Sequence, residues 1–479
     1  MSERPNLLVV HTDQQSLWTL GCYGGSLVDT PNIDAIASGG ALFGNFFVNS
    51  AVCTPSRGSM LTGRYPHCHG AYRNPVHINR DEVTLARVLA KAGYDTAYMG
   101  KWHLDGEDRP PDETVPPGRA MGFADSRYML NRGHRKSVGE NADGSLELSP
   151  ETGAGRYMTD WLGDKALEFL SARRENPFFL MVSIPDPHSP FPVREPYASM
   201  FDPQEMPLPT SCLEDPALPS WAREAPVGAG SWWHLEPGER GSELRRIKAL
   251  YCGMVKCIDD NVGRLLECLE ERGLADDTVV VFTTDHGDYM GEHGLTGKNM
   301  VYEGVYRIPL AVRWPKGVRP GTRVDRFVTG TDFQQTVLGL MGIAPSGREQ
   351  GRDASPFLRG ESPAWRDEAF IHHSRFGYAG VFTPDYELGL ARCGEHVLFD
   401  RREDPEQLVN LFGDPAHRPV VEELAGRVVE HNAGLDSPVL EWLSTWRRTD
   451  RQQPVDEGTI PSLDWYLARP ESRYALRRP

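Results

Sequence analysis

Residues 51–60 read AVCTPSRGSM and place Cys53 just ahead of Pro55 and Arg57 in a stretch of small residues. Three interpretations of Cys53 fit this stretch. A lone cysteine is most often a buried structural thiol. It could instead be a nucleophilic thiolate, because Arg57 and the N-terminus of a following helix would lower its pKa. The third interpretation is that Cys53 is converted into another group after synthesis. These ten residues leave all three open.

Further reactive side chains follow four short apolar runs, each of which predicts a β-strand. The strands are expected at residues 6–12, 94–99, 177–184 and 278–284. The polar residues that come after them, in chain order, are Asp13 and Gln14, Lys101 and His103, His188, and Asp285 and His286, with Lys298 a little further on. In open α/β sheets, ligands bind outside the carboxyl ends of the strands. If these strands are parallel neighbours, all these residues share one rim of the sheet.

The rim residues fall into two chemical groups. Those after the first and fourth strands offer mainly oxygen ligands and one imidazole, a set that suits Ca²⁺, Mg²⁺ or Mn²⁺ better than a structural zinc. The lysines and histidines after the other strands, together with Arg57, are cations or potential cations. Such a cluster on an acidic protein indicates an anionic substrate held beside a divalent metal.

The elements that position these residues follow an α/β pattern, in which apolar runs alternate with helical stretches and predict a largely parallel sheet. The clearest helix spans 242–273, with Ser242 as a candidate N-cap and Gly273 at its end. Residues 186–240 are rich in proline, tryptophan and glycine, and we expect them to form an ordered excursion over a pocket.

Three segments are expected along the chain: a catalytic α/β domain at 1–365, a small C-terminal α+β domain at 366–450, and an arm at 451–479. The small domain is indicated by short strand-like runs that precede a helix at 419–432. The arm is rich in arginine and aromatic residues, and we expect it to dock on another subunit of a homo-oligomer.

The bulk composition excludes several classes of protein. A net charge of −16 over 479 residues argues against non-specific nucleic-acid binding. No apolar run reaches the length of a membrane span, and the first residues, MSERPNLLVV, do not resemble a signal peptide. We therefore expect a cytoplasmic protein with no membrane partner. None of the eight cysteines forms a CxxC pair, so free thiols are expected.

The run CTPSR at 53–57, followed by LTGRYPHCHG, resembles the signature of the type I, formylglycine-dependent sulfatases of the alkaline phosphatase superfamily. Other segments resemble that family in the family's own order: NLLVVHTDQ, TPNIDAIASGG, GKWHL, PHSPF, DDTVVVFTTDHGDYMGEHG, RIPLAVRWP and LFDRREDPEQLVNL. The resemblance implies an alkaline phosphatase-like fold, with a large mixed sheet flanked by helices beside the small C-terminal domain. It also implies a sulfuric ester hydrolase.

For Cys53 the resemblance implies the third interpretation. In this family a dedicated maturation enzyme oxidises the signature cysteine to formylglycine (3-oxoalanine), and Pro55 and Arg57 match the positions that this enzyme recognises. The hydrated aldehyde carries two hydroxyl groups. One attacks sulfur and releases the alcohol, and deprotonation of the other then expels sulfate.

The implied metal ligands are Asp13, Gln14, Asp285, His286 and the modified Cys53. Gln14 stands where an aspartate is commoner, and His286 replaces the asparagine of many relatives. Ca²⁺ is the ion we expect first, and Mn²⁺ and Mg²⁺ stay open.

The implied catalytic residues besides Cys53 are Arg57, Lys101, His103, His188 and Lys298. The first two would hold and polarise the hydrated group, and His103 would accept its proton. His188 and Lys298 would bind the sulfate oxygens and assist the departing alcohol, and Asn74 would touch the substrate.

The leading hypothesis is therefore cleavage of a small sulfate monoester into an alcohol and inorganic sulfate. The same aldehyde and a similar metal site would also serve a phosphonate monoester or phosphodiester hydrolase. A non-catalytic binding protein with an unmodified Cys53 is a third possibility, against which the complete sets of metal ligands and cations argue. No motif in the sequence identifies the alcohol.

Overall fold

The computed structural model describes residues 4–433 and 435, except for 75, 107–109, 111, 213–217, 221–234 and 374–376. The expected arm at 451–479 and much of the expected excursion at 186–240 therefore lie outside the described residues.

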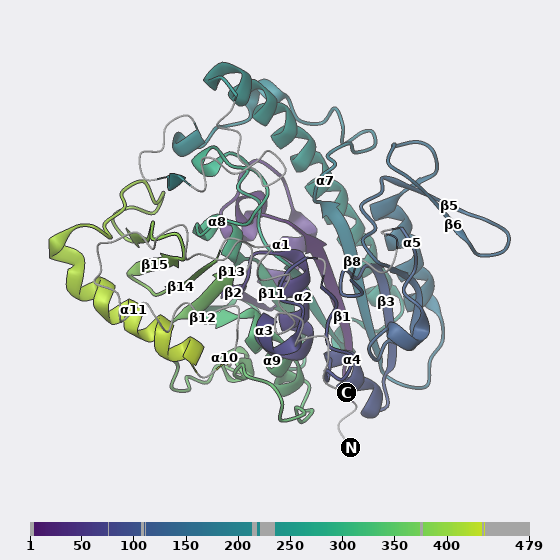
Figure 1. Ribbon diagram of the computed structural model, residues 1–479. Helices are drawn as coiled ribbons and strands as arrows, with labels where there is room; N and C mark the ends of the chain where they lie inside the picture. The colour runs from purple at the N-terminus through teal and green to yellow at the C-terminus, as the bar shows by residue number, and fades with distance from the viewer. Residues whose placement is uncertain are drawn as a thin grey trace.

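A nine-stranded mixed sheet forms the centre of the molecule (Figure 1). The strand order is β10-β2-β11-β9-β1-β8-β3-β4, and β12 also pairs with β2. The strands are β1 (Asn6–Asp13), β2 (Ala41–Phe47), β3 (Asp95–Lys101), β4 (Asp125–Leu130), β8 (Phe178–Pro187), β9 (Thr278–Thr284), β10 (Arg307–Ile308), β11 (Leu310–Arg313) and β12 (Thr322–Thr329).

The four strands predicted from the sequence are confirmed as β1, β3, β8 and β9. They are neighbours in the order β9-β1-β8-β3, and each adjacent pair is parallel. In the register, Val9 of β1 lies opposite Met181 of β8 and Val281 of β9. The carboxyl ends of these strands therefore meet at one rim of the sheet, as the sequence predicted.

Helices cover both faces of this sheet, which is why its central strands are buried along nearly their whole length. Along β1, Leu7 and Val9 belong to one core cluster, and Leu8 and Val10 belong to the other. The first face packs against α2 (Cys53–Thr62), α4 (Leu85–Lys91) and α9 (Phe333–Leu340). The second packs against α1 (Pro31–Ser38), α5 (Met158–Ser171) and α7 (Pro237–Glu271). The remaining short helices are α3 (Pro66–His69), α8 (Glu303–Tyr306) and α10 (Ser355–Leu358).

The long helix α7 begins earlier than the sequence predicted. Its first residue is Pro237, so the prediction that Ser242 caps the helix is wrong. Proline suits this first position because its missing N–H would have no helical partner there. The end is close to the prediction: the helix stops at Glu271, and Gly273 adopts a left-handed φ of 66°.

Two smaller sheets lie beside the main one. Four antiparallel strands pack with α11 (Arg418–Ala433) to form the small C-terminal α+β unit: β13 (Ala369–His373), β14 (Tyr378–Phe382), β15 (Tyr386–Ala391) and β16 (Val397–Asp400). The separate unit is confirmed, although β14 was not predicted and the domain boundaries stay a prediction. The third sheet holds β5 (Ser137–Glu140), β6 (Leu146–Ser149) and β7 (Arg156–Tyr157). Among the described residues, no helix has both the length and the apolar character needed to cross a membrane.

Candidate active site

Cys53 is the first residue of helix α2, whose N-terminus faces the rim of the sheet. Its side chain is buried, with 1% of the residue exposed. Asn74 steadies this end of the helix because its Oδ1 accepts a hydrogen bond from the backbone N–H of Thr54, at 3.0 Å. The hydroxyl of Thr54 in turn donates to the carbonyl oxygen of His103, at 2.8 Å. The helix start is thereby tied to the loop that follows β3.

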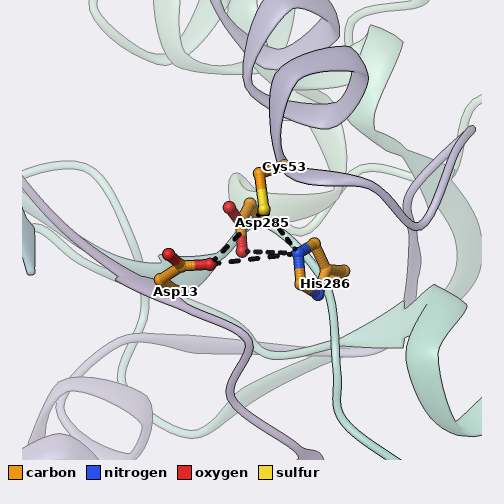
Figure 2. Close-up of side chains that lie close together, drawn as sticks. All are labelled: Asp13, Cys53, Asp285 and His286. Atoms are coloured by element: carbon orange, nitrogen blue, oxygen red, sulfur yellow. Dashed lines mark hydrogen bonds and ion pairs between the residues drawn. The ribbon is translucent and has the colours of Figure 1, made fainter. Parts of the chain in front are cut away.

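Three buried side chains, those of Asp13, Asp285 and His286, converge in front of Cys53 (Figure 2). The Cys53 sulfur lies 3.2 Å from Nε2 of His286 and 3.8 Å from Oδ1 of Asp13. The same Nε2 is 3.5 Å from Oδ1 of Asp285 and 3.9 Å from Oδ1 of Asp13. One ligand atom from each residue lies within 4.8 Å of all the others.

This donor set fits a divalent cation. Nδ1 of His286 lies 2.9 Å from the carbonyl oxygen of Gly287, to which it can only donate, so a neutral imidazole turns its Nε2 lone pair toward the two carboxylates. Burial and the neighbouring Asp13 both raise the pKa of Asp285. Acceptor atoms that face one another in a buried space need a positive charge between them, and hard oxygen ligands with one imidazole suit such an ion.

Two cations, Arg57 and Lys101, also contact the two aspartates. Arg57 donates from Nε to Oδ2 of Asp285, at 2.7 Å, and from Nη1 to Ser183 and to the carbonyl oxygen of Lys101. The Lys101 ammonium pairs with Oδ2 of Asp13. Burial alone would raise the pKa of the Asp13 carboxyl, but Lys101 and the other cations hold it well below its usual value.

The lysines of the site also change the pKa values of Cys53 and His103. Burial raises the pKa of the Cys53 thiol, but the Lys101 and Lys298 ammonium groups outweigh it, and the pKa falls well below its usual value. Burial, helped by Lys101, lowers the pKa of His103 to about 3. Nδ1 of this imidazole is buried and has no hydrogen-bond partner among the described residues. His103 is therefore a neutral base at pH 7.

Gln14, His188 and Lys298 form a second group at the rim. The Lys298 ammonium donates to Oε1 of Gln14 and lies 2.9 Å from Nε2 of His188. The amide nitrogen of Gln14 donates to Asp288, so both ends of this side chain are engaged. Burial and Lys298 hold the pKa of His188 well below its usual value, so its imidazole is neutral.

The family model described as sulfatase matches residues 5–343 of this chain. The chain belongs to the sulfatase family. A second model, for the C-terminal region of N-sulphoglucosamine sulphohydrolase, matches residues 291–434. The fold and the family agree, because the protein has the large mixed sheet of the alkaline phosphatase-like fold. It is thus a sulfuric ester hydrolase.

Known relatives of this sulfatase differ in their substrates. An N-acetylglucosamine-6-O-sulfatase from Bacteroides thetaiotaomicron is 29% identical, covering 88% of this chain and 85% of the relative. A solved structure in complex with its substrate D-glucosamine-2-N,6-O-disulfate matches with a TM-score of 0.74, 25% identity, and coverage of 92% and 100% of the two chains. A phosphonate monoester hydrolase from Agrobacterium radiobacter matches with a TM-score of 0.75, 25% identity, and coverage of 90% and 96%.

Sequence reasoning missed one residue of this sulfatase site. His134 lies in the loop after β4, and its Nε2 is 2.9 Å from Oδ2 of Asp13 and 3.0 Å from the Lys101 ammonium. The signal that could have found it is the strand DSRYML, which pairs with β3 and ends at the same rim. That strand was not predicted, so His134 was not placed.

Proposed function

We propose that this sulfatase cleaves a sulfate monoester with formylglycine at position 53 and one divalent cation. The observation that carries the proposal is the convergence of the buried Cys53 sulfur with the side chains of Asp13, Asp285 and His286. A cysteine that only packs in the core does not need two carboxylates and two ammonium groups around its sulfur. A residue that is to become a metal-bound nucleophile requires them.

Asp13, Asp285, His286 and the modified Cys53 would hold the cation. Ca²⁺ is the expected ion, with Mn²⁺ or Mg²⁺ as alternatives. When bound, the cation supplies Lewis-acid chemistry and neutralises the repulsion between the carboxylates. Ligation by Gln14 stays a prediction, and its Oε1, which accepts from the Lys298 ammonium, has a second lone pair that an ion could use.

Formylglycine supplies, as its hydrate, one hydroxyl that attacks sulfur and another whose deprotonation releases sulfate. Arg57 and Lys101 would hold this group in place, because Arg57 joins the Cys53 helix to Asp285 and the Lys101 ammonium pairs with Asp13. His103 would accept the proton, since its imidazole is neutral and its Nδ1 is unengaged. A dedicated maturation enzyme would install the aldehyde.

His188 and Lys298 would bind the sulfate oxygens and assist the departing alcohol. Nζ of Lys298 lies 2.9 Å from Nε2 of His188, and the positive charge of Lys298 would attract an anionic ester. A sulfated amino sugar is the first substrate to test, because relatives of this chain act on or bind such sugars. The cytoplasmic location and the homo-oligomer stay predictions.

A phosphonate monoester hydrolase is the second candidate, because a solved enzyme of that activity shares the fold over 90% of this chain. We expect kcat/KM for an aryl sulfate to exceed that for the matching aryl phosphonate monoester. We also expect His103→Ala to lower sulfate turnover by roughly 10²- to 10⁴-fold, as loss of a general base does. A wild type that prefers the phosphonate, with sulfate turnover intact in His103→Ala, would move the chain to the second activity.

A further inference from the structure

The imidazole rings of His134 and His188 stack at the mouth of the site. Their centroids are 4.2 Å apart and the rings are inclined by 21°. Each imidazole lies beside one lysine of the site, because Nε2 of His134 is 3.0 Å from Lys101 and Nε2 of His188 is 2.9 Å from Lys298. The stacked pair thus links two ammonium groups from separate segments, Lys101 at the end of β3 and Lys298 in the loop well after β9.

A buried ion pair lies two residues along the chain from each imidazole. Nζ of Lys136 is 2.6 Å from Oδ1 of Asp186, and both side chains are 2% exposed. Lys136 follows His134 by two residues, and Asp186 precedes His188 by two residues. The pair therefore joins the loop that carries His134 to the end of β8, just ahead of His188.

The other oxygen of Asp186 is also engaged. Oδ2 accepts hydrogen bonds from the hydroxyl of Tyr157, at 2.5 Å, and from the hydroxyl of Thr159, at 2.8 Å. Tyr157 ends β7 and Thr159 lies in the first turn of α5. Asp186 thereby fastens the small three-stranded sheet and the start of α5 to the end of β8. A buried charge pair is a costly way to stabilise a fold, so a role in placement explains it better.

We propose that His134, Lys136 and Asp186 form a positioning unit for the reaction, in which the buried ion pair holds the His134–His188 stack and His134 fixes the Lys101 ammonium. The inference rests on the proposed roles of Lys101 and His188 in handling the sulfate group. None of the three residues needs to touch the substrate, because each acts through another side chain.

The first test removes both charges of the pair together. The double variant Lys136→Met/Asp186→Asn leaves no uncompensated buried charge, and the amide oxygen at position 186 still accepts from Tyr157 and Thr159. We expect a melting temperature close to that of the wild type and a fall of about tenfold or more in kcat/KM for an aryl sulfate, because small misplacements are costly. A stable double variant with wild-type kcat/KM would overturn the role of the pair.

The second test concerns His134. We expect His134→Ala to lose about tenfold or more in kcat/KM, His134→Gln to retain more activity than His134→Ala, and added imidazole to restore part of the loss. A merely structural role would show no rescue. The matched control is Arg135→Gln in the same loop, where Arg135 pairs with Asp112 at the surface, and it should behave as wild type. His134→Ala with wild-type kcat/KM would overturn the role of His134.

Calorimetric binding of inorganic sulfate separates failure of this inference from failure of the proposed function. If the wild type binds sulfate but does not turn over sulfate esters, the proposed function fails. The positioning unit would still stand if sulfate affinity falls about tenfold in His134→Ala and in the double variant, as loss of a supporting contact does. Unchanged sulfate affinity in both proteins would overturn the unit.

Discussion

Two groups of buried or half-buried histidines in this protein differ in their neighbours and in their pKa values. The first group lines the candidate site: His103, His134, His188 and His286. The second lies between α3 and the C-terminal unit: His67, His69, His372 and His431. The first faces two carboxylates and two lysines. The second contacts mainly other rings. The ring centroids of His67 and His372 are 5.0 Å apart, and the ring of His431 stacks on that of Phe370 with centroids 3.8 Å apart.

Burial opposes the charged form of the imidazole in both groups. It lowers the pKa of His69 and His372 to about 3, and that of His134 to about 4. His286 is different: burial has the largest effect and lowers its pKa, but the carboxylate of Asp285 and the sulfur of Cys53 together outweigh burial and raise the pKa. Of these eight histidines, only His286 combines a nearby carboxylate with a raised pKa, while burial lowers the pKa of His103, His134 and His188 as it does in the packing group. We infer from the facing carboxylates that the site needs a cation.

Metal removal should produce the largest effect and should act on the first group alone. We expect chelation to abolish sulfate-ester turnover and to lower the melting temperature, because Asp13 and Asp285 then repel each other in a buried space. Turnover and thermal melting before and after chelation, with elemental analysis, check this. The inactive variant Cys53→Ala should show the same fall in melting temperature, since its remaining ligands still hold the ion. Turnover that survives in demonstrably metal-free protein would refute the metal site.

Replacing Lys101, one of the two lysines of the site, should have the next largest effect. We expect Lys101→Met to lower kcat by about 10²- to 10³-fold, as the loss of one charge-stabilising donor does. Lys248→Met is the matched control, because Lys248 is also buried but its ammonium donates to the carbonyl oxygen of Pro207, outside the site. Steady-state kinetics of both variants check the prediction. Equal losses of kcat in the two proteins would show that burial of a lysine, and not its place at the rim, matters.

The packing histidines should lower the stability of the fold at acidic pH. Because the pKa of His372 is about 3 in the folded protein and near 6.5 in the unfolded chain, the unfolded chain binds more protons below pH 6.5. The contribution of His372 to the free energy of unfolding is present above pH 6.5 and is lost as the pH falls toward 3. The loss reaches about 2 kcal/mol at pH 5.

We therefore expect His372→Phe to reduce the fall in unfolding free energy between pH 7 and pH 5 by about 2 kcal/mol. Urea unfolding at the two pH values measures it. Tyr65→Phe, in the same aromatic group, changes packing without removing an imidazole and should leave the pH dependence as in the wild type. An unaltered pH dependence in His372→Phe would mean that this histidine does not drive the acid response.

The sequence predicted the rim because each of its four strands is a short, largely apolar run that is followed by polar residues. Such runs are visible locally, and parallel strands bring their ends together. Strand β4 was not predicted because its sequence is not continuously apolar: Arg127 is exposed and Tyr128 is half-buried. Without that strand, His134 could not be placed at the rim.

The Lys136–Asp186 pair was beyond prediction for a different reason. Its partners are 50 residues apart, and their meeting depends on the path of the small β5-β6-β7 sheet between them. Nothing in the local pattern fixes that path. The start of α7 was misjudged because Ser242 is a good capping residue, while Pro237, five residues earlier, also begins a helix well.

The central claim is that Cys53 becomes an aldehyde and that the aldehyde carries the activity. Peptide mass spectrometry of protein produced with and without a formylglycine-generating enzyme, set beside kcat for an aryl sulfate, tests it most directly. We predict that turnover rises in proportion to the converted fraction and is absent in Cys53→Ala. A fully active preparation in which position 53 carries only an unmodified thiol would contradict the claim.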